Sequence, residues 1–292
     1  MTNIVDPKRE VASSATKPAR LAHISDLHFG RCDPAVSESL LQDLRDHQPG
    51  LIVISGDLTM RARNSEFEEA MSFIERLPSP WLCVPGNHDI PHYNLIRRVV
   101  TPFKRYRRYV GDELMPRLET ENYAIIGLNT TRSFSWKHLD WSRGRVNMNQ
   151  LATARAWFDD IPRGKPRIVF GHHPFILPDE DPSRGTVGRL NKALTSFAFS
   201  EVDLLLAGHL HQAFWRRLSV GTSEENGNVH ELLALQASTA TSDRLRGEAN
   251  AYHIIDVEPN RFMIELREWT GASFDRRETM HHQINGTRGA ES

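Results

Sequence analysis

The sequence predicts an α/β fold in which two β-sheets pack against each other. Short apolar segments alternate with helix-like segments in the first half of the chain, which is typical of a sheet with parallel strands covered by helices. After residue 211 the pattern changes to short strands separated by turn signals, which predicts hairpins and a second sheet with antiparallel strands packed on the first. Five polar motifs directly follow strand-like segments, so we expect them at the sheet edge where α/β proteins bind ligands.

Hydrophobic periodicity defines the elements of the first half. Strands are predicted over residues 21–24, 51–54 and 81–84. A helix over residues 35–47 carries apolar side chains at helical spacing, and a second helix over residues 64–77 has one apolar stripe. We expect Ser65 and Glu68 to form the capping box of the second helix.

The strand–helix rhythm breaks at residues 92–118, which we interpret as a helical insert near the ligand-binding edge. Six basic residues lie from Arg97 to Arg108 with no acidic residue among them. This segment is either a solvated helical face or a rim that attracts anionic substrates, and the sequence leaves both interpretations open.

The remaining elements follow from the same rules. Asn149 is expected to cap a helix that contains Leu151 and Phe158. Residues 271–292 are polar, so we expect a C-terminal tail there and a single domain over residues 21–270. The other predicted strands cover residues 123–128, 168–170, 204–207, 214–220, 231–235, 251–257 and 262–267.

Composition excludes several classes of protein. The 292 residues are 39% hydrophobic and 25% charged, which is ordinary for a soluble domain, and the formal net charge of −1 indicates no particular partner. Two cysteines, Cys32 and Cys83, do not predict a disulfide framework, and Cys83 is expected in the core. Residues 1–20 lack the apolar segment of a signal peptide, and no stretch has the length of a membrane span. We therefore expect a flexible tail over residues 1–20 and a cytoplasmic protein that does not bind membranes.

Five motifs combine aspartate, histidine and asparagine, whose side chains are common ligands of divalent metals. They are Asp26-Leu27-His28, Gly56-Asp57, Gly86-Asn87-His88-Asp89, Gly171-His172-His173-Pro174 and Gly208-His209-Leu210-His211. An isolated Gly-Asp or His-x-His pair often arises by chance, whereas five motifs in order after five strands do not. The sequence therefore predicts a metal site made by the loops that follow these strands.

The spacing of the motifs suits two ions held close together. Two adjacent divalent ions need an anionic bridge, and the carboxylate of Asp57 can give one oxygen to each ion. Asp26 and His28 are two residues apart on one loop and can reach the same ion. His209 and His211 have the same spacing and can serve opposite ions.

Neutral ligands complete the predicted set. Asn87 offers an amide oxygen and His172 an imidazole nitrogen, and this mixed ligation fits Mn, Fe, Zn or Co better than Ca or Mg. Two divalent ions outweigh the two carboxylates, so the site should favour hydroxide and an anionic substrate such as a phosphate ester. His88 follows Asn87 and is placed to protonate a leaving oxygen or to hold a phosphoryl oxygen.

With these motifs the chain resembles the calcineurin-like metallophosphoesterase superfamily, whose signature is D-x-H, G-D, G-N-H-D/E, H and G-H-x-H. The resemblance covers about residues 21–211 and implies a four-layer αββα sandwich, in which two packed mixed β-sheets are flanked by helices. It implies a first metal site of Asp26, His28, Asp57 and His211, and a second of Asp57, Asn87, His172 and His209. His88 matches the family histidine beside the metals, and His173 has no ligand role in the family pattern.

Within the superfamily the chain looks most like the bacterial branch of class III cyclic-nucleotide phosphodiesterases and glycerophosphodiesterases. This resemblance implies a dinuclear enzyme that hydrolyses small phosphodiesters by attack of a metal-bridging hydroxide. The alternatives are a nuclease or a phosphomonoesterase of the same fold; a nuclease should show an extended basic groove or a partner domain. A non-catalytic scaffold should lack ligands, and none of the signature positions is missing. A homo-oligomer is compatible with the sequence.

Overall fold

A computed structural model describes residues 19–133, 143–181, 185–221 and 229–284 of the chain. Most of the tail expected over residues 1–20 therefore lies outside the described residues, and Ala19 begins the first strand. Among the described residues, no helix combines the length and the apolar character that crossing a membrane requires.

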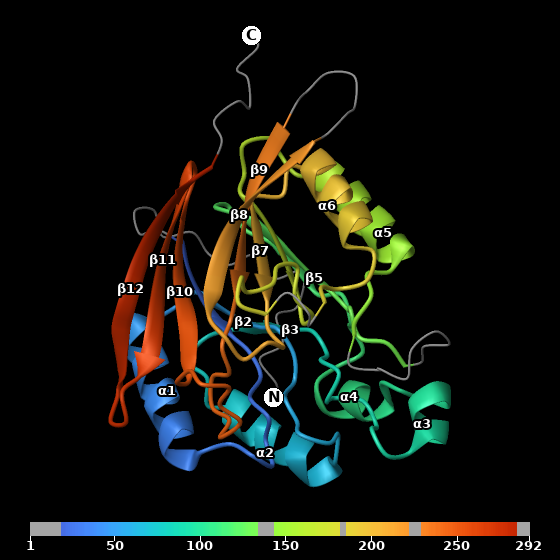
Figure 1. The fold of residues 1–292 in the computed structure, drawn as a ribbon, viewed down its shortest axis with the longest axis vertical. Coiled ribbons are helices and arrows are strands. Elements are labelled where there is room, and N and C mark those ends of the chain that lie inside the picture. Colours follow the sequence, from blue (N-terminus) through green and yellow to red (C-terminus); the bar gives the residue numbers. More distant parts are fainter. Residues whose placement is uncertain (1–18, 134–142, 182–184, 222–228, 285–292) are drawn as a thin grey trace.

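The first sheet has the strand order β12-β11-β10-β1-β2-β3 (Figure 1). Its strands are β1 (Ala19–Ile24), β2 (Leu51–Ile54), β3 (Trp81–Cys83), β10 (Ala251–Glu258), β11 (Arg261–Trp269) and β12 (Phe274–Gln283). Strands β1, β2 and β3 run parallel, and β10 pairs antiparallel with β1, placing His23 opposite His253. The first half of the chain therefore forms the parallel part of this sheet, as the strand–helix rhythm predicts.

The second sheet has the order β4-β5-β6-β7-β9-β8. Its strands are β4 (Arg117–Glu119), β5 (Ala124–Leu128), β6 (Arg167–Gly171), β7 (Leu204–Ala207), β8 (Phe214–Gly221) and β9 (Val229–Gln236). Strands β5, β6, β7 and β9 run parallel, with antiparallel strands at both edges.

The prediction that the segments after residue 211 together form the second sheet is therefore wrong, although the second sheet does contain antiparallel strands and packs on the first. The hairpin of β8 and β9 joins the second sheet through the parallel pairing of β9 with β7, whereas β10, β11 and β12 join the first sheet through β1. Apolar alternation identifies a strand, but the partner strand is chosen by contacts that are distant in the sequence.

Helices cover the outer faces of the two sheets and produce the predicted four-layer αββα sandwich. They are α1 (Pro34–His47), α2 (Asn64–Ile74), α3 (Leu95–Val100), α4 (Lys104–Tyr109), α5 (Met148–Asp159) and α6 (Leu190–Phe199). Helices α1 and α2 lie on the first sheet and α5 and α6 on the second, while α3 and α4 lie to one side (Figure 1). Residues 92–118 thus contain two short helices and the first two residues of the short edge strand β4.

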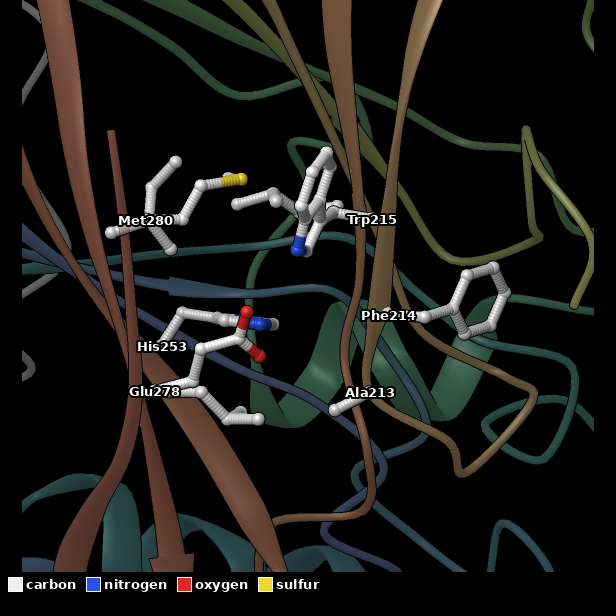
Figure 2. A pocket seen from close by; sticks show the side chains of 9 residues that line it. Ala213, Phe214, Trp215, His253, Glu278 and Met280 are labelled. Carbon is white, nitrogen blue, oxygen red and sulfur yellow. The ribbon is translucent and has the colours of Figure 1, made fainter. Parts of the chain in front are cut away.

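The layer between the sheets is filled by apolar side chains from both. Leu21, Val53 and Ile255 of the first sheet meet Phe170 and Leu206 of the second, and all five are buried. At the end of this layer near β8 and β12, the packing leaves a cavity of about 210 Å³ (Figure 2).

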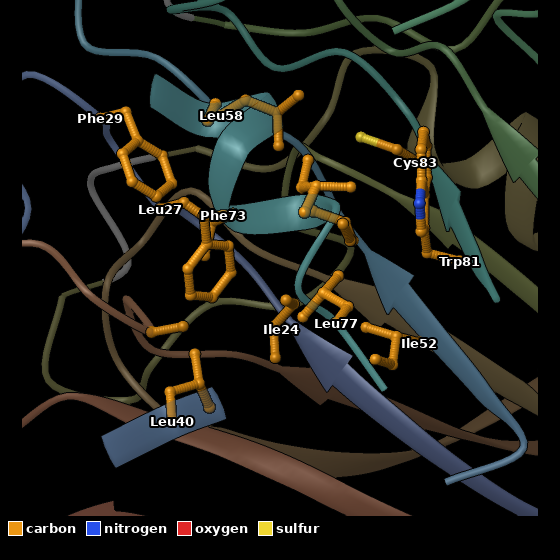
Figure 3. Close-up of a cluster of buried hydrophobic side chains, with 14 of the residues drawn as sticks. Ile24, Leu27, Phe29, Leu40, Ile52, Leu58, Phe73, Leu77, Trp81 and Cys83 are labelled. Carbon is orange, nitrogen blue, oxygen red and sulfur yellow. The ribbon is translucent and has the colours of Figure 1, made fainter. Parts of the chain in front are cut away.

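A second apolar layer lies between the first sheet and its helices (Figure 3). Ile24 and Ile52 of the sheet pack with Leu40 of α1 and Phe73 of α2, and Cys83 is buried there as predicted. The apolar stripe of α2 is therefore confirmed, and this layer holds the ends of β1, β2 and β3 in fixed relative positions.

Two helix caps differ from prediction by two residues. Glu66, not Glu68, closes the start of α2, because its carboxylate accepts hydrogen bonds from the backbone N–H groups of Arg61 and Arg63. Asn147, not Asn149, caps α5 by accepting from the N–H of Asn149. Both shifts lie within the usual uncertainty of a helix start read from sequence.

The C-terminal tail expected over residues 271–292 is corrected in its first part, because Phe274–Gln283 forms strand β12. This edge strand buries Phe274, Met280 and His282 and exposes most of its polar side chains, which explains its polar sequence. Residues 285–292 lie outside the described residues.

Candidate metal centre

The seven predicted metal ligands come together at the carboxyl ends of five parallel strands. Loops after β1, β2 and β3 of the first sheet supply Asp26, His28, Asp57 and Asn87, and loops after β6 and β7 of the second sheet supply His172, His209 and His211. The site therefore lies where the two sheets meet at one end of the sandwich, as the strand-end motifs predict.

Strained backbone is concentrated at these ligands. Asp26, His28, Asp57, His209 and His211 have φ angles of 54°, 48°, 54°, 79° and 59°. A non-glycine residue with positive φ is uncommon and costs on the order of 1–3 kcal/mol, and such strain clusters at functional sites. Five of the seven predicted ligands are therefore held in a conformation that only the surrounding structure can stabilise.

Glycine at position 208 is required by close packing against the Asp26 loop. A β-carbon at this position would lie 1.8 Å from Oγ of Ser25 and 2.5 Å from Oδ2 of Asp26. The same carboxylate oxygen accepts hydrogen bonds from Ser25 Oγ at 2.6 Å and from the N–H of His209 at 2.8 Å. The loops after β1 and β7 are therefore locked together through one oxygen of Asp26.

The other oxygen of Asp26 faces two imidazoles. Its Oδ1 is buried, has no hydrogen-bond partner, and lies 3.3 Å from Nε2 of His211 and 3.6 Å from Nε2 of His28. A buried carboxylate oxygen without a donor is costly unless a cation is beside it. Asp26, His28 and His211 thus present one oxygen and two nitrogens to a common point.

Backbone carbonyls fix the orientation of these two imidazoles. Nδ1 of His28 lies 3.4 Å from the carbonyl of Thr59, and Nδ1 of His211 lies 2.9 Å from the carbonyl of Arg244. A carbonyl can only accept, so each Nδ1 carries the proton of the neutral ring and each Nε2 holds a lone pair. The two Nε2 atoms are 3.1 Å apart, and a metal ion bound by both lone pairs would suit this arrangement.

The second cluster forms around His172, which is fully buried. Its Nδ1 donates to the carbonyl of Ser55 at 2.8 Å, and its Nε2 lies 3.1 Å from Oδ1 of Asn87. Nε2 also lies 3.2 Å from Oδ2 of Asp57 and 3.3 Å from Nδ1 of His209. Oxygen and nitrogen acceptors therefore surround this one atom.

The carboxylate of Asp57 favours one positive charge in this cluster. Burial lowers the pKa of His172, but the charge of Asp57 outweighs burial and raises the pKa to about 9. Burial and the neighbouring His172 lower the pKa of His209 to about 3. Burial would raise the pKa values of Asp26 and Asp57, but the imidazoles more than offset it and hold both well below the usual range.

Asp57 lies between the two clusters. Its Oδ2 is 3.2 Å from Nε2 of His172 and 3.8 Å from Nε2 of His28, while its Oδ1 accepts from the N–H of His88 at 2.8 Å. The donor set is therefore two nitrogen- and oxygen-containing clusters that share a carboxylate, which fits a pair of transition-metal ions.

His88 stands at the edge of the site. Its Nδ1 lies 2.7 Å from the carbonyl of Met60, and its ring is perpendicular to that of His28 at 5.0 Å. The side chain is only partly buried, whereas His28 is fully buried. Nδ1 is therefore engaged, and Nε2 is the ring nitrogen left for a ligand.

His173 also lies within the cluster. One of its ring nitrogens is close to ligand atoms of His172 and His209, all within 4.8 Å of one another. Its Nδ1 is 2.7 Å from the hydroxyl of Thr130, and its ring is buried. The structure thus brings His173 to the site, although the resemblance gives it no ligand role.

Asp89 organises the site, a role that was not predicted from the sequence. This buried carboxylate accepts from the N–H groups of Gly86, Leu58 and Thr59 at 2.9, 3.2 and 2.9 Å. It therefore ties the loop after β2 to the loop after β3. Burial and the charge of Asp57 raise its pKa to about 6. Its position in the Gly-Asn-His-Asp motif was the available signal.

The segment from Ser238 to Arg246, which follows β9, reaches the site. The hydroxyl of Thr239 donates to the carbonyl of Asp26 at 2.6 Å, and Arg244 supplies the carbonyl that holds His211. The guanidinium of Arg244 lies 3.5 Å from Sδ of Met60, the residue whose carbonyl faces His88. This loop therefore adds a cation near the site.

The basic segment from Arg97 to Arg108 contains both structural and accessible cations. Arg98 is buried and donates to the carbonyl oxygens of Pro91, Ser133 and Arg132, so it anchors α3. Four other basic residues line a hollow of about 260 Å³ that also includes Asn64 and Pro91: Arg97, Lys104, Arg105 and Arg108. The segment is therefore more than a uniformly solvated helical face.

Comparison with known proteins agrees with this geometry. The sequence model of the calcineurin-like phosphoesterase family matches residues 19–213. A probable cyclic nucleotide phosphodiesterase of Synechococcus sp. is 26% identical over 209 residues, which are 66% of this chain and 74% of that relative. The glycerophosphodiester phosphodiesterase GpdQ of Enterobacter lignolyticus is 31% identical over 170 residues, which are 53% of this chain and 56% of that relative.

A likeness to solved structures supports the fold. A purple acid phosphatase from yellow lupin (Lupinus luteus) seeds aligns with a TM-score of 0.65 at 12% identity, covering 91% of this chain and 54% of that one. The matched family model covers more than half of the chain and includes all five motifs. The chain belongs to the calcineurin-like phosphoesterase family.

Proposed function

We propose that this member of the calcineurin-like phosphoesterase family is a dinuclear metal-dependent phosphodiesterase that hydrolyses small phosphodiesters. The observation that carries the proposal is the pair of imidazole–carboxylate clusters on either side of Asp57. Relatives in this family that are named cyclic nucleotide and glycerophosphodiester phosphodiesterases support the diester class.

The proposed ligand sets follow the two clusters. The first ion is assigned to Asp26, His28, Asp57 and His211, and the second to Asp57, Asn87, His172 and His209. Lone pairs of His28 and His211 directed at each other support the first set. The acceptors around Nε2 of His172 support the second. Mn, Fe, Zn or Co would suit this mixture of nitrogen and oxygen donors.

Two bound divalent ions would lower the pKa of water to yield a nucleophile at neutral pH and would neutralise charge on a phosphoryl group. Asp26 and Asp57 offset only two of the positive charges on the ions, so the net positive charge favours an anionic substrate. The buried carboxylates also keep the ligand loops together, since Asp26 accepts from the loop that follows β7.

His88 is proposed to protonate the leaving oxygen. The carbonyl of Met60 holds Nδ1, so Nε2 is the ring nitrogen left to serve a substrate. Burial lowers the pKa of His88, and the charge of Asp57 opposes that effect. A bound anionic substrate would raise this lowered pKa, because a nearby negative charge favours the imidazolium form. The proton would then pass from Nε2 to the departing alkoxide.

The accessible basic residues beside α3 and α4 are proposed to attract the substrate. Arg97, Lys104 and Arg108 line one hollow, and like charges on a rim raise the local concentration of anions. These residues would increase the rate at which the substrate binds and would leave the chemical step unchanged. We also propose that the protein is cytoplasmic.

The test is hydrolysis by metal-reconstituted protein with metal analysis alongside. We expect about two transition-metal ions per chain and faster turnover of bis(p-nitrophenyl) phosphate, cyclic AMP or a glycerophosphodiester than of p-nitrophenyl phosphate. Asp57→Ala should lose metal and activity together, whereas Glu38→Ala, at an exposed ion pair with Arg76 away from the site, should keep both. A monoester turned over fastest would refute the diester class, and Asp57→Ala protein with two tightly bound ions would refute the bridge.

A further inference from the structure

Helix α3 and the residues just before it carry a cluster of exposed apolar side chains. Of the ten large apolar residues exposed among the described residues, five lie in this one segment: Tyr93, Leu95, Ile96, Val99 and Val100. We call these five residues the α3 patch. Ile96 is 77% exposed and Val100 is 71% exposed. Single exposed apolar residues are common on soluble proteins, but a cluster of them indicates a surface that binds a partner.

The apolar side chains of α3 face away from the body of the protein. Successive residues of a helix are about 100° apart, so one continuous arc contains Leu95, Ile96, Val99 and Val100. Arg98 lies on the far side of the helix, where its buried guanidinium donates to the carbonyl oxygens of Pro91 and Arg132. Figure 1 shows α3 at the edge of the molecule. Arg98 therefore anchors the helix, and the apolar arc is left to the outside.

Positive charge borders the α3 patch. Three exposed cations of α3 and α4 line one hollow: Arg97, Lys104 and Arg108. None of the three forms an ion pair among the described residues, and no acidic residue occurs between residues 90 and 111. The exposed Arg61 adds a further cation, since its guanidinium lies 5.9 Å from the centroid of the Tyr93 ring. This surface therefore combines exposed apolar groups with positive charge that the described residues do not neutralise.

We propose that the α3 patch and its cations bind the surface of an anionic lipid bilayer. The apolar side chains would enter the boundary between headgroups and acyl chains, while the cations would contact the anionic headgroups. This contact is peripheral and needs no membrane-spanning helix. It differs from the expectation, drawn from the lack of an apolar span, that the protein does not bind membranes. The binding does not depend on the proposed role of the same cations in substrate capture.

A bilayer fits this surface better than other partners do. In a symmetric dimer through α3, the patch would face its own copy and bring like charges together. A nucleic acid backbone would neutralise the cations but would leave Ile96 and Val100 without an apolar partner. A stable protein interface buries about 800 Å² on each partner, and a helix of six residues is small for that area. A bilayer presents anionic and apolar groups together and needs no matching shape.

The experiment measures co-sedimentation of the full-length chain with lipid vesicles. One set of vesicles is pure phosphatidylcholine, and the other contains about 30% phosphatidylglycerol, which is anionic. We expect saturable binding to the anionic vesicles that is at least about 10-fold tighter than binding to the neutral ones at low ionic strength. Added salt should weaken the binding, because it screens the attraction between the cations and the headgroups.

A double variant tests the apolar side chains without changing charge. Ile96→Gln combined with Val100→Gln should weaken binding to the anionic vesicles by roughly 10-fold, because two side chains no longer enter the apolar part of the bilayer. Both positions are exposed, so the melting temperature should not change. The matched control combines Phe199→Gln and Val229→Gln, which alter exposed apolar residues of α6 and β9. The control should bind both vesicles as the unsubstituted chain does.

Four results would overturn the proposal. The first is no binding to the anionic vesicles at low ionic strength, and the second is equal binding to anionic and neutral vesicles. The third is a folded double variant that binds anionic vesicles with unchanged affinity. The fourth is self-association that the double variant abolishes while vesicles are not bound, which would assign the patch to a second copy of the chain. These readouts do not use hydrolysis, so they are independent of the proposed phosphodiesterase activity.

Discussion

Oδ1 of Asp57 occupies the space where a side chain at Gly86 would have to be. A β-carbon on residue 86 would lie 2.0 Å from this oxygen and 2.3 Å from the backbone nitrogen of Asp57. Contacts this short cannot be relieved by a rotamer change, because one of the two atoms belongs to the backbone. The carboxylate proposed to bridge the metals is thus positioned by the absence of a side chain on the neighbouring loop.

Gly86→Ala should therefore displace Asp57 and weaken metal binding. We expect affinity for the more weakly held ion to fall by roughly 10- to 100-fold, the range seen when the surroundings of a metal ligand are disturbed. Titration with Mn²⁺ or Zn²⁺, read by metal content after dialysis, measures the effect. Gly50→Ala is the matched control, since its β-carbon would meet only the carbonyl of Arg20 at 3.6 Å. Equal metal retention by the two variants would contradict the steric argument.

His88→Ala should retain most of the metal and lower turnover by roughly 10²- to 10⁴-fold on a diester with a poor leaving group. The reason is that Nδ1 is held by Met60 and Nε2 is left to serve the leaving oxygen. Steady-state kinetics on an alkyl diester and on an activated aryl diester separate the roles, because the aryl leaving group needs little protonation.

The control for this variant is His92→Ala, which removes an exposed imidazole four residues along the chain. It should leave both rates nearly unchanged. Equal losses on the alkyl and aryl diesters in His88→Ala would point to a role in binding the phosphoryl group and against proton transfer.

Burial of His253 makes stability depend on pH. Its pKa is lowered from 6.5 to about 4 in the folded chain, so below pH 6.5 the unfolded chain binds the proton first. The stability contributed by the neutral ring is present above pH 6.5 and is lost as pH falls from there toward 4. Between pH 7.5 and pH 5 the folded chain should lose about 2 kcal/mol through this group.

His253→Phe should remove that part of the pH dependence. Urea unfolding of metal-free protein at pH 7.5 and pH 5 gives the free energy of unfolding for each chain, and metal removal avoids linkage to ligand protonation. The difference between the two pH values should be about 2 kcal/mol smaller in the variant. His281→Phe, at an exposed position on β12, should leave the difference unchanged. An unaltered difference in His253→Phe would show that this ring does not titrate as its burial predicts.

The ligand motifs could be predicted from sequence because each combines a buried strand with a polar turn, and both signals are local. Asp26 and His211 are therefore identifiable without knowing their neighbours. Their orientation could not be predicted, since it depends on backbone carbonyls such as those of Thr59 and Arg244, which leave no trace in the sequence.

The pairing of strands could not be predicted either, because local sequence patterns do not determine which strands become neighbours. The segments that become β9 and β10 follow one another and have similar apolar patterns, yet they enter different sheets. Strand β12 was missed because an edge strand needs few apolar residues, and Phe274 and Met280 are too far apart to give a clear alternation. Helix α6, which covers the second sheet, was missed as well. Asp89 lay within a recognised motif, but its role depends on donors from the loop after β2.

Neutralising the accessible cations beside α3 and α4 should slow substrate capture without altering the chemical step. In the variant with Arg97, Lys104 and Arg108 all changed to Gln, KM should rise several-fold at low ionic strength and become less sensitive to salt, while kcat stays nearly constant. Arg98 is left intact because it holds α3 through three carbonyls, and Arg105 is left intact because it donates to the carbonyl of Ala62. The effect should fade above about 0.5 M salt, where exposed charges are screened.

The control removes the same charge elsewhere. Arg163, Lys192 and Arg276 are exposed residues on other elements, and their triple change to Gln alters net charge equally. If attraction is local to the hollow beside α3 and α4, only the first variant raises KM. Equal increases in both variants would mean that net charge alone steers the substrate. An unchanged KM in the first variant at low ionic strength would mean that this segment is a solvated helical face that does not attract the substrate, with Arg98 as its structural anchor.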